Sequence, residues 1–367
     1  MALNTVKGNT RVPFIPGTKP SIKNAQLLVS TGIPSLDHII GGGLPIGSLF
    51  AIEEDTYGTY AKVMSKYFMA EGVITEQPLL LASQDVKPSQ LISEIPSVVT
   101  DVTPINQPQH MDEQMKIAWR YQNMKMVDSS PTGGQSFGHF YDLTKPMEKE
   151  TIDKANIIQW HDENWHTSDS LFTNIAYMNL LKRIQETLSK GQYSVSEAPP
   201  KRQVLRVAIC SLGSRQWLSD SEDSSHRDLL KFLYYLRTLL RNSYAVVLIT
   251  IPADNFDKPG AIVERIEHMS DIAIRLESFA GSARETNPLF KDYHGLLHVK
   301  KLPALNTLAP HNPESRDLAF KLRRKKFVIE VLHLPPELED TAQREQDDII
   351  PQTGGCMTNT RKSVLDF

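Results

Sequence analysis

Residues 53–60 stand where a phosphate-binding loop would carry its chemistry, between a short apolar run and a predicted helix. A loop of the pattern G-x-x-x-x-G-K-[ST] holds phosphates with backbone N–H groups, a lysine and a hydroxyl that binds magnesium. A Gly-rich turn at a helix N-terminus suits this chemistry because its N–H groups point at the anion. The residues at this place are Glu53, Glu54, Asp55, Thr56, Tyr57, Gly58, Thr59 and Tyr60.

The loop keeps one element of the pattern, the second glycine, as Gly58. The lysine position is Thr59 and the hydroxyl position is Tyr60, so the point charge and the magnesium ligand are both missing. Three carboxylates, residues 53–55, stand near the expected phosphates, and each would repel a phosphate charge by about 4 kcal/mol at ~4 Å. We therefore predict no conventional ATP hydrolysis, no catalytic residue and no bound cofactor.

Two other strand ends agree with this prediction and leave one alternative open. The predicted strand 204–210 ends in Ser211, where related ATPases place a magnesium-binding aspartate. The predicted strand 79–82 is followed by Gln84, which cannot act as a general base, and by Asp85, which can. A divergent ring ATPase that uses the Gly58 loop in an unusual way therefore remains the alternative.

The elements around the loop form a strand–helix–strand unit. We expect a strand over 48–52, a helix over 59–72 with Gly72 past its end, and a strand over 79–82. Such units build parallel sheets. The alternation continues with helices at 171–188, 227–241 and 262–269 and strands at 204–210, 245–251, 272–276, 296–300 and 327–332. The chain is thus predicted to be α/β, with a mainly parallel sheet and helices on both faces.

The rest of the chain reads as two tails and one insertion. Residues 1–28 are basic and proline-containing, which predicts a flexible tail. Residues 29–336 form the expected domain, and 96–166 form an insertion whose aromatic residues indicate packing. Residues 337–367 are rich in carboxylates and predict a second flexible tail.

Composition excludes several classes of protein. The 40 basic and 43 acidic residues give a net charge of -3, unlike a generally basic nucleic-acid coat protein. Two cysteines make neither a disulfide framework nor a four-cysteine zinc site, so we expect a reducing compartment. The longest strongly apolar run, 245–251, is far shorter than the ~20 residues of a membrane span, so we expect no membrane partner.

A basic cluster interrupts the even charge balance near residue 324. On an exposed edge it would neutralise phosphates of a nucleic acid, whereas the alternative is a solvated charge run before the last strand. We expect His298, Lys300 and Lys301 on the same side. The cluster consists of Lys321, Arg323, Arg324, Lys325 and Lys326.

Other candidate residues favour structural roles. His161 and His166 are five residues apart, which is wrong for one helical face, so we predict no metal site. Cys210 lies in an apolar strand and is expected to be a small buried hydrophobe. The aromatic run 119–121 either packs the insertion or stacks on bases, and packing is favoured.

Several segments of the chain carry a resemblance to known proteins. The entry into the domain, STGIPSLD and GGGLPIGS, resembles that of RecA-like ATPases. Further segments narrow it: MKIAWRY (115–121), FGHFYD (137–142), ESF (277–279) with ETNPLFKDYHG (285–295), and DLAFKL (317–322) with LHLPP (332–336). Together these segments resemble the PAXNEB family, the fourth subunits of the Elongator complex.

The resemblance implies a RecA-like fold with a degenerate phosphate loop and a non-catalytic role. Family members join the fifth and sixth Elongator subunits in a hetero-hexameric ring, which binds tRNA and serves the catalytic Elongator subcomplex. That complex modifies the C5 position of the wobble uridine in tRNA, and the family acts in the cytoplasm and also the nucleus. A role with RNA polymerase II in transcription elongation is the third alternative.

Overall fold

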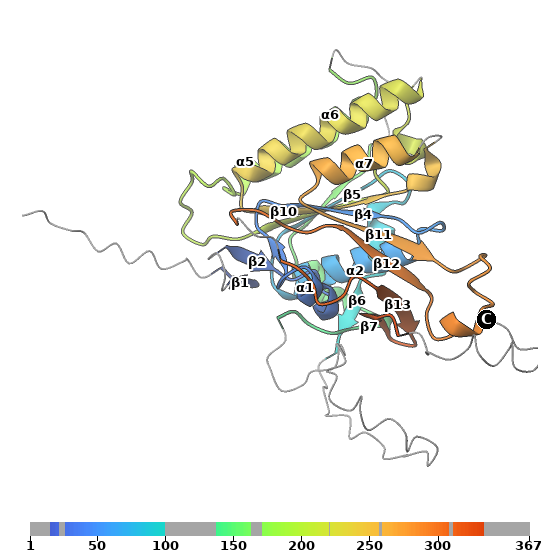
Figure 1. Cartoon of the computed structure of the whole chain (residues 1–367). Helices are drawn as coiled ribbons and strands as arrows, with labels where there is room; N and C mark the ends of the chain where they lie inside the picture. The colour runs from blue at the N-terminus through green and yellow to red at the C-terminus, as the bar shows by residue number, and fades with distance from the viewer. Residues whose placement is uncertain are drawn as a thin grey trace, which may run out of the picture. The chain divides into compact units, whose positions relative to one another are not determined.

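A computed structural model describes residues 15–21, 26–99, 137–162, 171–219, 221–256, 259–307 and 311–333. Within these residues a nine-stranded sheet is central, with the order β14-β13-β12-β11-β4-β10-β9-β5-β8 (Figure 1). Six strands are parallel: β8 (Ile157–Trp160), β5 (Leu79–Ser83), β9 (Leu205–Cys210), β10 (Ala245–Ile251), β4 (Leu49–Glu53) and β11 (Ile272–Ser278). The predicted α/β class with a mainly parallel sheet is confirmed.

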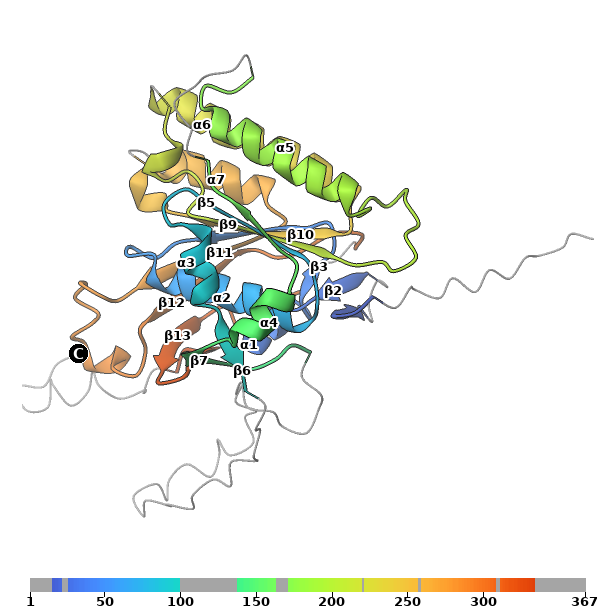
Figure 2. The same cartoon turned by 180° about the vertical axis from the view of Figure 1, so that it is seen from behind.

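Helices cover both faces of this sheet, as Figures 1 and 2 show. Strand β4 illustrates why: Phe50 and Ile52 belong to one apolar core, whereas Leu49 and Ala51 belong to the other. One face carries α5 (Ile175–Lys190), α6 (Glu222–Arg241) and α7 (Pro259–Met269). The other carries α1 (Pro34–Ile39), α2 (Thr59–Ile74), α3 (Pro88–Ser93) and α4 (Lys149–Lys154).

Helix α2 runs further than predicted. It ends at Ile74, so Gly72 lies inside it and not past its end. A glycine stands here because the side chain of the buried Arg206 on the sheet comes very close. A Cβ at position 72 would lie 2.8 Å from Cδ of Arg206. The glycine is therefore needed for packing, a use that its sequence position alone does not distinguish from a helix stop.

The far edge of the sheet is antiparallel and contains a strand that the sequence analysis did not predict. Strands β12 (Gly295–Lys301), β13 (Leu318–Arg323) and β14 (Lys326–Val331) follow β11 in an antiparallel arrangement. β12 and β14 correspond to the two late strands that we expected, but β13 was missed. Its outer half is charged, which hid the strand pattern. The basic cluster thus spans a β-hairpin and not a loop before the last strand.

The expected N-terminal tail and insertion both contribute to the structure. Strand β1 (Thr18–Pro20) pairs with β2 (Leu27–Val29), which pairs with β3 (Leu44–Pro45). Residues 18–20 and 27–28 of the predicted tail 1–28 are therefore strand residues. Within 96–166, β6 (Pro96–Val98) pairs with β7 (Tyr141–Pro146), and β8 adds an edge strand to the central sheet.

Short 3-10 turns occur at Arg215–Trp217, Ala253–Asn255 and Pro288–Phe290. Among the residues that the structure describes, no helix has the length and apolar character needed to cross a membrane.

Candidate functional site

The loop between β4 and α2 lies at the carboxyl edge of the parallel strands. The ends of β5, β9 and β10 meet at the same edge, so the loop stands where open α/β sheets bind ligands. A pocket of about 250 Å³ opens there. Its lining is Glu54, Asp55, Thr56, Tyr57, Gly58, Lys62, Asp85, Val86, Ser211, Pro252, Ala253, Asp254 and Asn255.

Asp55 occupies the N-terminus of α2 with its own carboxylate. The side chain is buried and accepts hydrogen bonds from the backbone N–H groups of Thr59 at 3.0 Å, Tyr60 at 2.9 Å and Ala61 at 3.1 Å. These are the donors that a phosphate would take at a helix N-terminus. A nucleotide phosphate would therefore have to displace a carboxylate that is already bonded in place.

Glu54 points back toward the sheet. Its Oε1 accepts hydrogen bonds from Thr250 Oγ1 at 2.6 Å and Ser211 Oγ at 2.9 Å. Burial raises the pKa of Glu54 above its usual range, although these two hydroxyls act in the opposite direction. Glu54 therefore ties the loop to the ends of β9 and β10.

Glu53 is engaged on the opposite side of β4. Its carboxylate lies 3.5 Å from Nε of Arg275 on the neighbouring strand β11. Burial raises its pKa, and the charge of Arg275 partly compensates. The structure therefore places the three carboxylates in three different environments, and Asp55 is the one bonded to the N–H groups at the start of α2.

The remaining loop residues complete this picture. Gly58 has a φ of 63°, the left-handed conformation that glycine adopts without strain. Thr59 is exposed at the start of α2, while the Tyr60 ring packs against Phe320 with centroids 4.7 Å apart. Tyr57, which the sequence analysis did not single out, is 67% exposed at the tip of the loop. The signal in the sequence that could have identified it is an aromatic residue between the turn residues Thr56 and Gly58.

The strand ends that could support ATP hydrolysis are only partly suited to it. Asp85 lines the pocket, its Oδ1 accepts a hydrogen bond from Ser214 Oγ at 2.5 Å, and burial raises its pKa. Gln84 is buried, and its Oε1 accepts from the N–H of Asp162 at 3.3 Å. Among the residues that line the pocket, the cation is Lys62. It lies one turn into α2, whereas the phosphate-binding pattern places its lysine at position 59.

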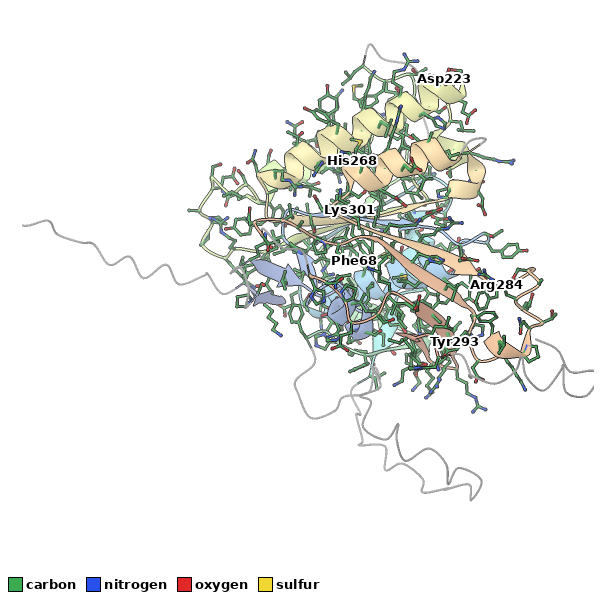
Figure 3. All side chains as sticks on the ribbon, in the orientation of Figure 1. Phe68, Asp223, His268, Arg284, Tyr293 and Lys301 are labelled. Carbon is green, nitrogen blue, oxygen red and sulfur yellow. The ribbon has the colours of Figure 1, made fainter. Side chains whose placement is uncertain are left out.

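The basic cluster divides into a buried member and an exposed group on the β13–β14 hairpin. Lys321 is buried, with its Nζ in an ion pair with Glu330 and 5.4 Å from the centroid of the Tyr293 ring, which Figure 3 labels. The residues at the tip of the hairpin share an exposed surface. They are Arg323, Arg324, Lys325 and Lys326.

Strand β7 adds a cation to the hairpin tip that the sequence analysis missed. The pKa of Asp142 is lowered mainly by a hydrogen bond from the Thr144 side chain. The positive charges of Lys325 and Lys145 lower it further. Lys325 Nζ lies 3.6 Å from that carboxylate. Nothing in the sequence connects positions 145 and 325, since the pairing depends on the fold. We call residues 323–326 with Lys145 the basic hairpin surface.

The residues expected beside the cluster make other contacts. His298 Nε2 lies 2.8 Å from Glu277 Oε2, and Lys301 Nζ donates to the His268 carbonyl at 2.7 Å. Both Lys301 and His268 are labelled in Figure 3, away from Tyr293. Lys300 is an exposed residue of β12. These side chains do not extend the basic hairpin surface.

The other candidates of the sequence analysis are placed as follows. His161 Nδ1 contacts the Ser83 carbonyl at 2.8 Å, while His166 and the run 119–121 lie outside the described residues. Within the described ranges, no group of three or more His, Cys, Asp or Glu side chains is arranged to hold a metal ion. Cys210 is buried, and burial raises the pKa of its thiol to about 12.

Comparison with known proteins supplies the family. The PAXNEB protein family model matches residues 11–367. Elongator complex protein 4 of Xenopus laevis is 44% identical over 356 residues, which cover 91% of this chain and 86% of that protein. Elongator complex protein 4 of Danio rerio is 43% identical, covering 94% and 93%, and that of Mus musculus is 41% identical, covering 98% and 90%. With a match over nearly its whole length and relatives above 40% identity, the chain belongs to the PAXNEB family.

Proposed function

We propose that this chain is a non-catalytic scaffold subunit of the Elongator complex. It joins the fifth and sixth subunits in a hetero-hexameric RecA-like ring in the cytoplasm and the nucleus. The ring binds and releases tRNA for modification of the wobble uridine at C5 by the catalytic subcomplex. The support is the similarity to Elongator complex protein 4 together with the geometry of the degenerate loop.

The observation that carries the non-catalytic part is the position of Asp55. Its carboxylate accepts from three N–H groups at the start of α2, within 2.9–3.1 Å, where a phosphate-binding loop would hold its anion. Binding ATP there would replace an intramolecular anion that the chain already holds at high effective concentration. The loop also lacks the lysine that would favour the exchange.

ATP turnover by the purified full chain tests this part. We expect no hydrolysis above a buffer control, and none after the substitution Asp55→Ala. Hydrolysis by the chain alone that is abolished by Gly58→Asp would overturn the scaffold proposal and favour the divergent ATPase. The specific observation behind that alternative is Asp85, a carboxylate with a raised pKa that faces the pocket.

The exposed tip of the loop supports a role in ring assembly. Tyr57 is 67% exposed, and the rim around it carries carboxylates such as Asp254. Tyrosine is one of the residue types enriched among those that carry most of the binding energy in protein interfaces. We expect the full chain mixed with the fifth and sixth subunits to give an assembly with the mass of a hexamer, and Tyr57→Ala to weaken it. Failure of the three chains to associate would exclude the proposed ring.

The basic hairpin surface supports the tRNA part. Arg324 stands at the turn, while Lys325 and Lys326 keep exposed positions beside it. We expect the double substitution Lys325→Glu and Lys326→Glu in the assembled ring to weaken tRNA binding at least tenfold and to reduce its salt dependence. A matched control is Lys182→Glu with Lys190→Glu, since both lysines are exposed on α5. Unchanged tRNA affinity after the hairpin substitutions would remove this surface from the proposal.

A further inference from the structure

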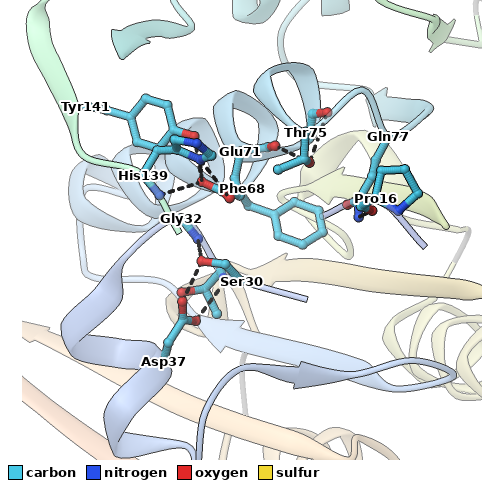
Figure 4. A network of polar contacts seen from close by, with 12 residues as sticks. Pro16, Ser30, Gly32, Asp37, Phe68, Glu71, Thr75, Gln77, His139 and Tyr141 are labelled. Atoms are coloured by element: carbon cyan, nitrogen blue, oxygen red, sulfur yellow. Dashed lines mark hydrogen bonds and ion pairs between the residues drawn. The ribbon is translucent and has the colours of Figure 1, made fainter. Parts of the chain in front are cut away.

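A buried carboxylate on α2 holds a distant segment of the chain against the body of the protein (Figure 4). Glu71 is 2% exposed, and its Oε2 accepts hydrogen bonds from Tyr141 Oη at 2.6 Å and from the His139 backbone N–H at 3.1 Å. The His139 ring completes the contact, with Nδ1 3.2 Å from Glu71 Oε1. One carboxylate thus takes three contacts from residues about 70 positions later in the sequence.

The segment 138–143, here called the strap, touches the body of the protein at its first residue. Gly138 has a φ of 102°, and a Cβ there would lie 2.3 Å from Ser30 Oγ. Only glycine fits this approach without a shift. Ser30 Oγ in turn donates to Asp37 Oδ2 at 2.5 Å, so the strap begins on a bonded polar pair.

The opposite end of the strap contacts the basic hairpin. The Leu143 N–H donates to the Lys325 carbonyl at 2.9 Å, and Asp142 pairs with Lys325 Nζ at 3.6 Å. Lys326 Nζ lies 5.8 Å from the centroid of the Phe140 ring. The hairpin is also bonded to α2, because the Phe327 N–H donates to Tyr67 Oη at 3.0 Å. The strap and α2 therefore hold the hairpin from two sides.

His139 is the member of this arrangement that water reaches, since 45% of its side chain is exposed. The hydrogen bond to Glu71 raises its pKa, against a smaller opposing effect of burial. Burial alone would raise the pKa of Glu71, but His139, the charge of Arg206 and Tyr141 hold it below its usual range. Among the described residues, the titratable groups that face His139 and its partners Glu71 and Tyr141 are Asp37, Arg206, Tyr67 and Lys326.

We propose that the strap fixes the position of the basic hairpin, and that protonation of His139 tightens its attachment to Glu71. A charged imidazole makes a stronger hydrogen bond to a carboxylate than a neutral one does. A histidine whose pKa is raised in the folded state gives its full contribution at low pH and loses it as the pH rises through that raised value. The strap is therefore tightest under mildly acidic conditions and loosens toward alkaline pH.

Hydrogen exchange of the full chain tests the proposal, with two amides as reporters. Leu143 reports the bond between strap and hairpin, and Phe327 reports the bond between hairpin and α2. Each variant is compared with the wild type at the same pH, so that the intrinsic exchange rate cancels. His139→Gln keeps a hydrogen-bond donor but does not titrate. Because the side chain is about half exposed, we expect this variant to fold.

We expect both amides to exchange roughly five to ten times faster in His139→Gln than in the wild type at about pH 6, with the ratio falling toward one at about pH 8.5. Tyr141→Phe removes a neutral donor, so its ratio should exceed one equally at both pH values. His298→Gln is the matched control, since His298 also pairs with a glutamate and is 40% exposed, and its ratios should stay near one.

Three results would overturn the proposal. One is a His139→Gln ratio that does not change with pH. Another is a change at Leu143 with none at Phe327, which would separate the strap from the hairpin. The third is an equal pH-dependent effect of His298→Gln. Exchange does not depend on the proposed function; only the further expectation, that His139→Gln weakens tRNA binding of the ring at about pH 6, rests on it.

Discussion

A buried carboxylate lies near each end of helix α2, and the two are bonded in different ways. Asp55 accepts from N–H groups four to six residues ahead, at the start of the helix itself. Glu71 accepts from His139 and Tyr141, and it lies near the charge of Arg206 from β9. The first is a local cap and the second a tertiary anchor. The same helix thus carries a carboxylate that caps its own start and another that binds distant segments near its end.

Of the substitutions near the two ends of α2, we expect Glu71→Ala to lower the free energy of unfolding the most. Glu71→Ala deprives Arg206, which is fully buried, of the carboxylate that most favours its charge. Loss of one member of a buried charged arrangement costs about 3–5 kcal/mol of the free energy of unfolding. Urea unfolding at pH 7 measures this, with Glu94→Ala, an exposed partner of Lys66, as the control. A loss below about 1 kcal/mol would mean that Glu71 is not an anchor.

The next largest effect is a pH dependence of stability that comes from Asp37, a neighbour of Glu71. Burial raises the pKa of Asp37 to about 7, so the folded state holds this proton more tightly than the unfolded chain. The contribution of Asp37 to stability therefore falls as the pH rises from about 5 through 7. Because asparagine does not titrate, the free energy of unfolding of Asp37→Asn should rise relative to that of the wild type by about 2–3 kcal/mol between about pH 5 and 7. Unfolding midpoints at several pH values check this, and a constant difference would contradict it.

A smaller effect is expected at the opposite end of α2. Asp55→Ala removes the acceptor of three N–H groups and should lower the free energy of unfolding by about 1–2 kcal/mol. Asp254→Ala is the matched control, because Asp254 lines the same pocket and lies in a short 3-10 turn. Chemical unfolding measures both. Equal effects of the two substitutions would show that Asp55 is not a special cap.

The smallest effect on stability is expected at the loop tip. Tyr57 is 67% exposed, so Tyr57→Ala should change the free energy of unfolding by no more than about 0.5 kcal/mol. The same variant is expected to weaken assembly with the other two subunits. Thermal unfolding of the isolated chain and sedimentation of the mixture separate the two outcomes. A large loss of stability would show that Tyr57 supports the loop and does not serve as an interface anchor.

The local part of the site was predictable and the distant part was not. The loss of the lysine and hydroxyl positions at Thr59 and Tyr60 is visible in the sequence, and so is Gly58 before the helix. The sequence also placed Asp55 among three repelling charges, but it did not show that Asp55 caps α2. Capping depends on the path of a short loop, whereas a charge count does not.

The missed elements have a similar explanation. Strand β13 escaped prediction because its outer residues are cations, although Phe320 and its neighbours are buried between other strands. The sequence predicts Gly72 as a helix end, because nothing in it reveals the side chain of Arg206 beside this glycine. In each case a tertiary contact overrides a local preference.

The α/β class, the order of most strands and helices, and the degeneracy of the phosphate loop all follow from the amino-acid sequence. These follow from hydrophobic periodicity and from residue types at short spacing, which act within a few residues. Only the folded structure shows where Glu53 and Glu54 are bonded, that Lys145 joins the basic hairpin, and that Glu71 holds the strap. Those contacts join positions about 70 or more residues apart, and only the folded packing of helix, strap and hairpin brings them within hydrogen-bond distance.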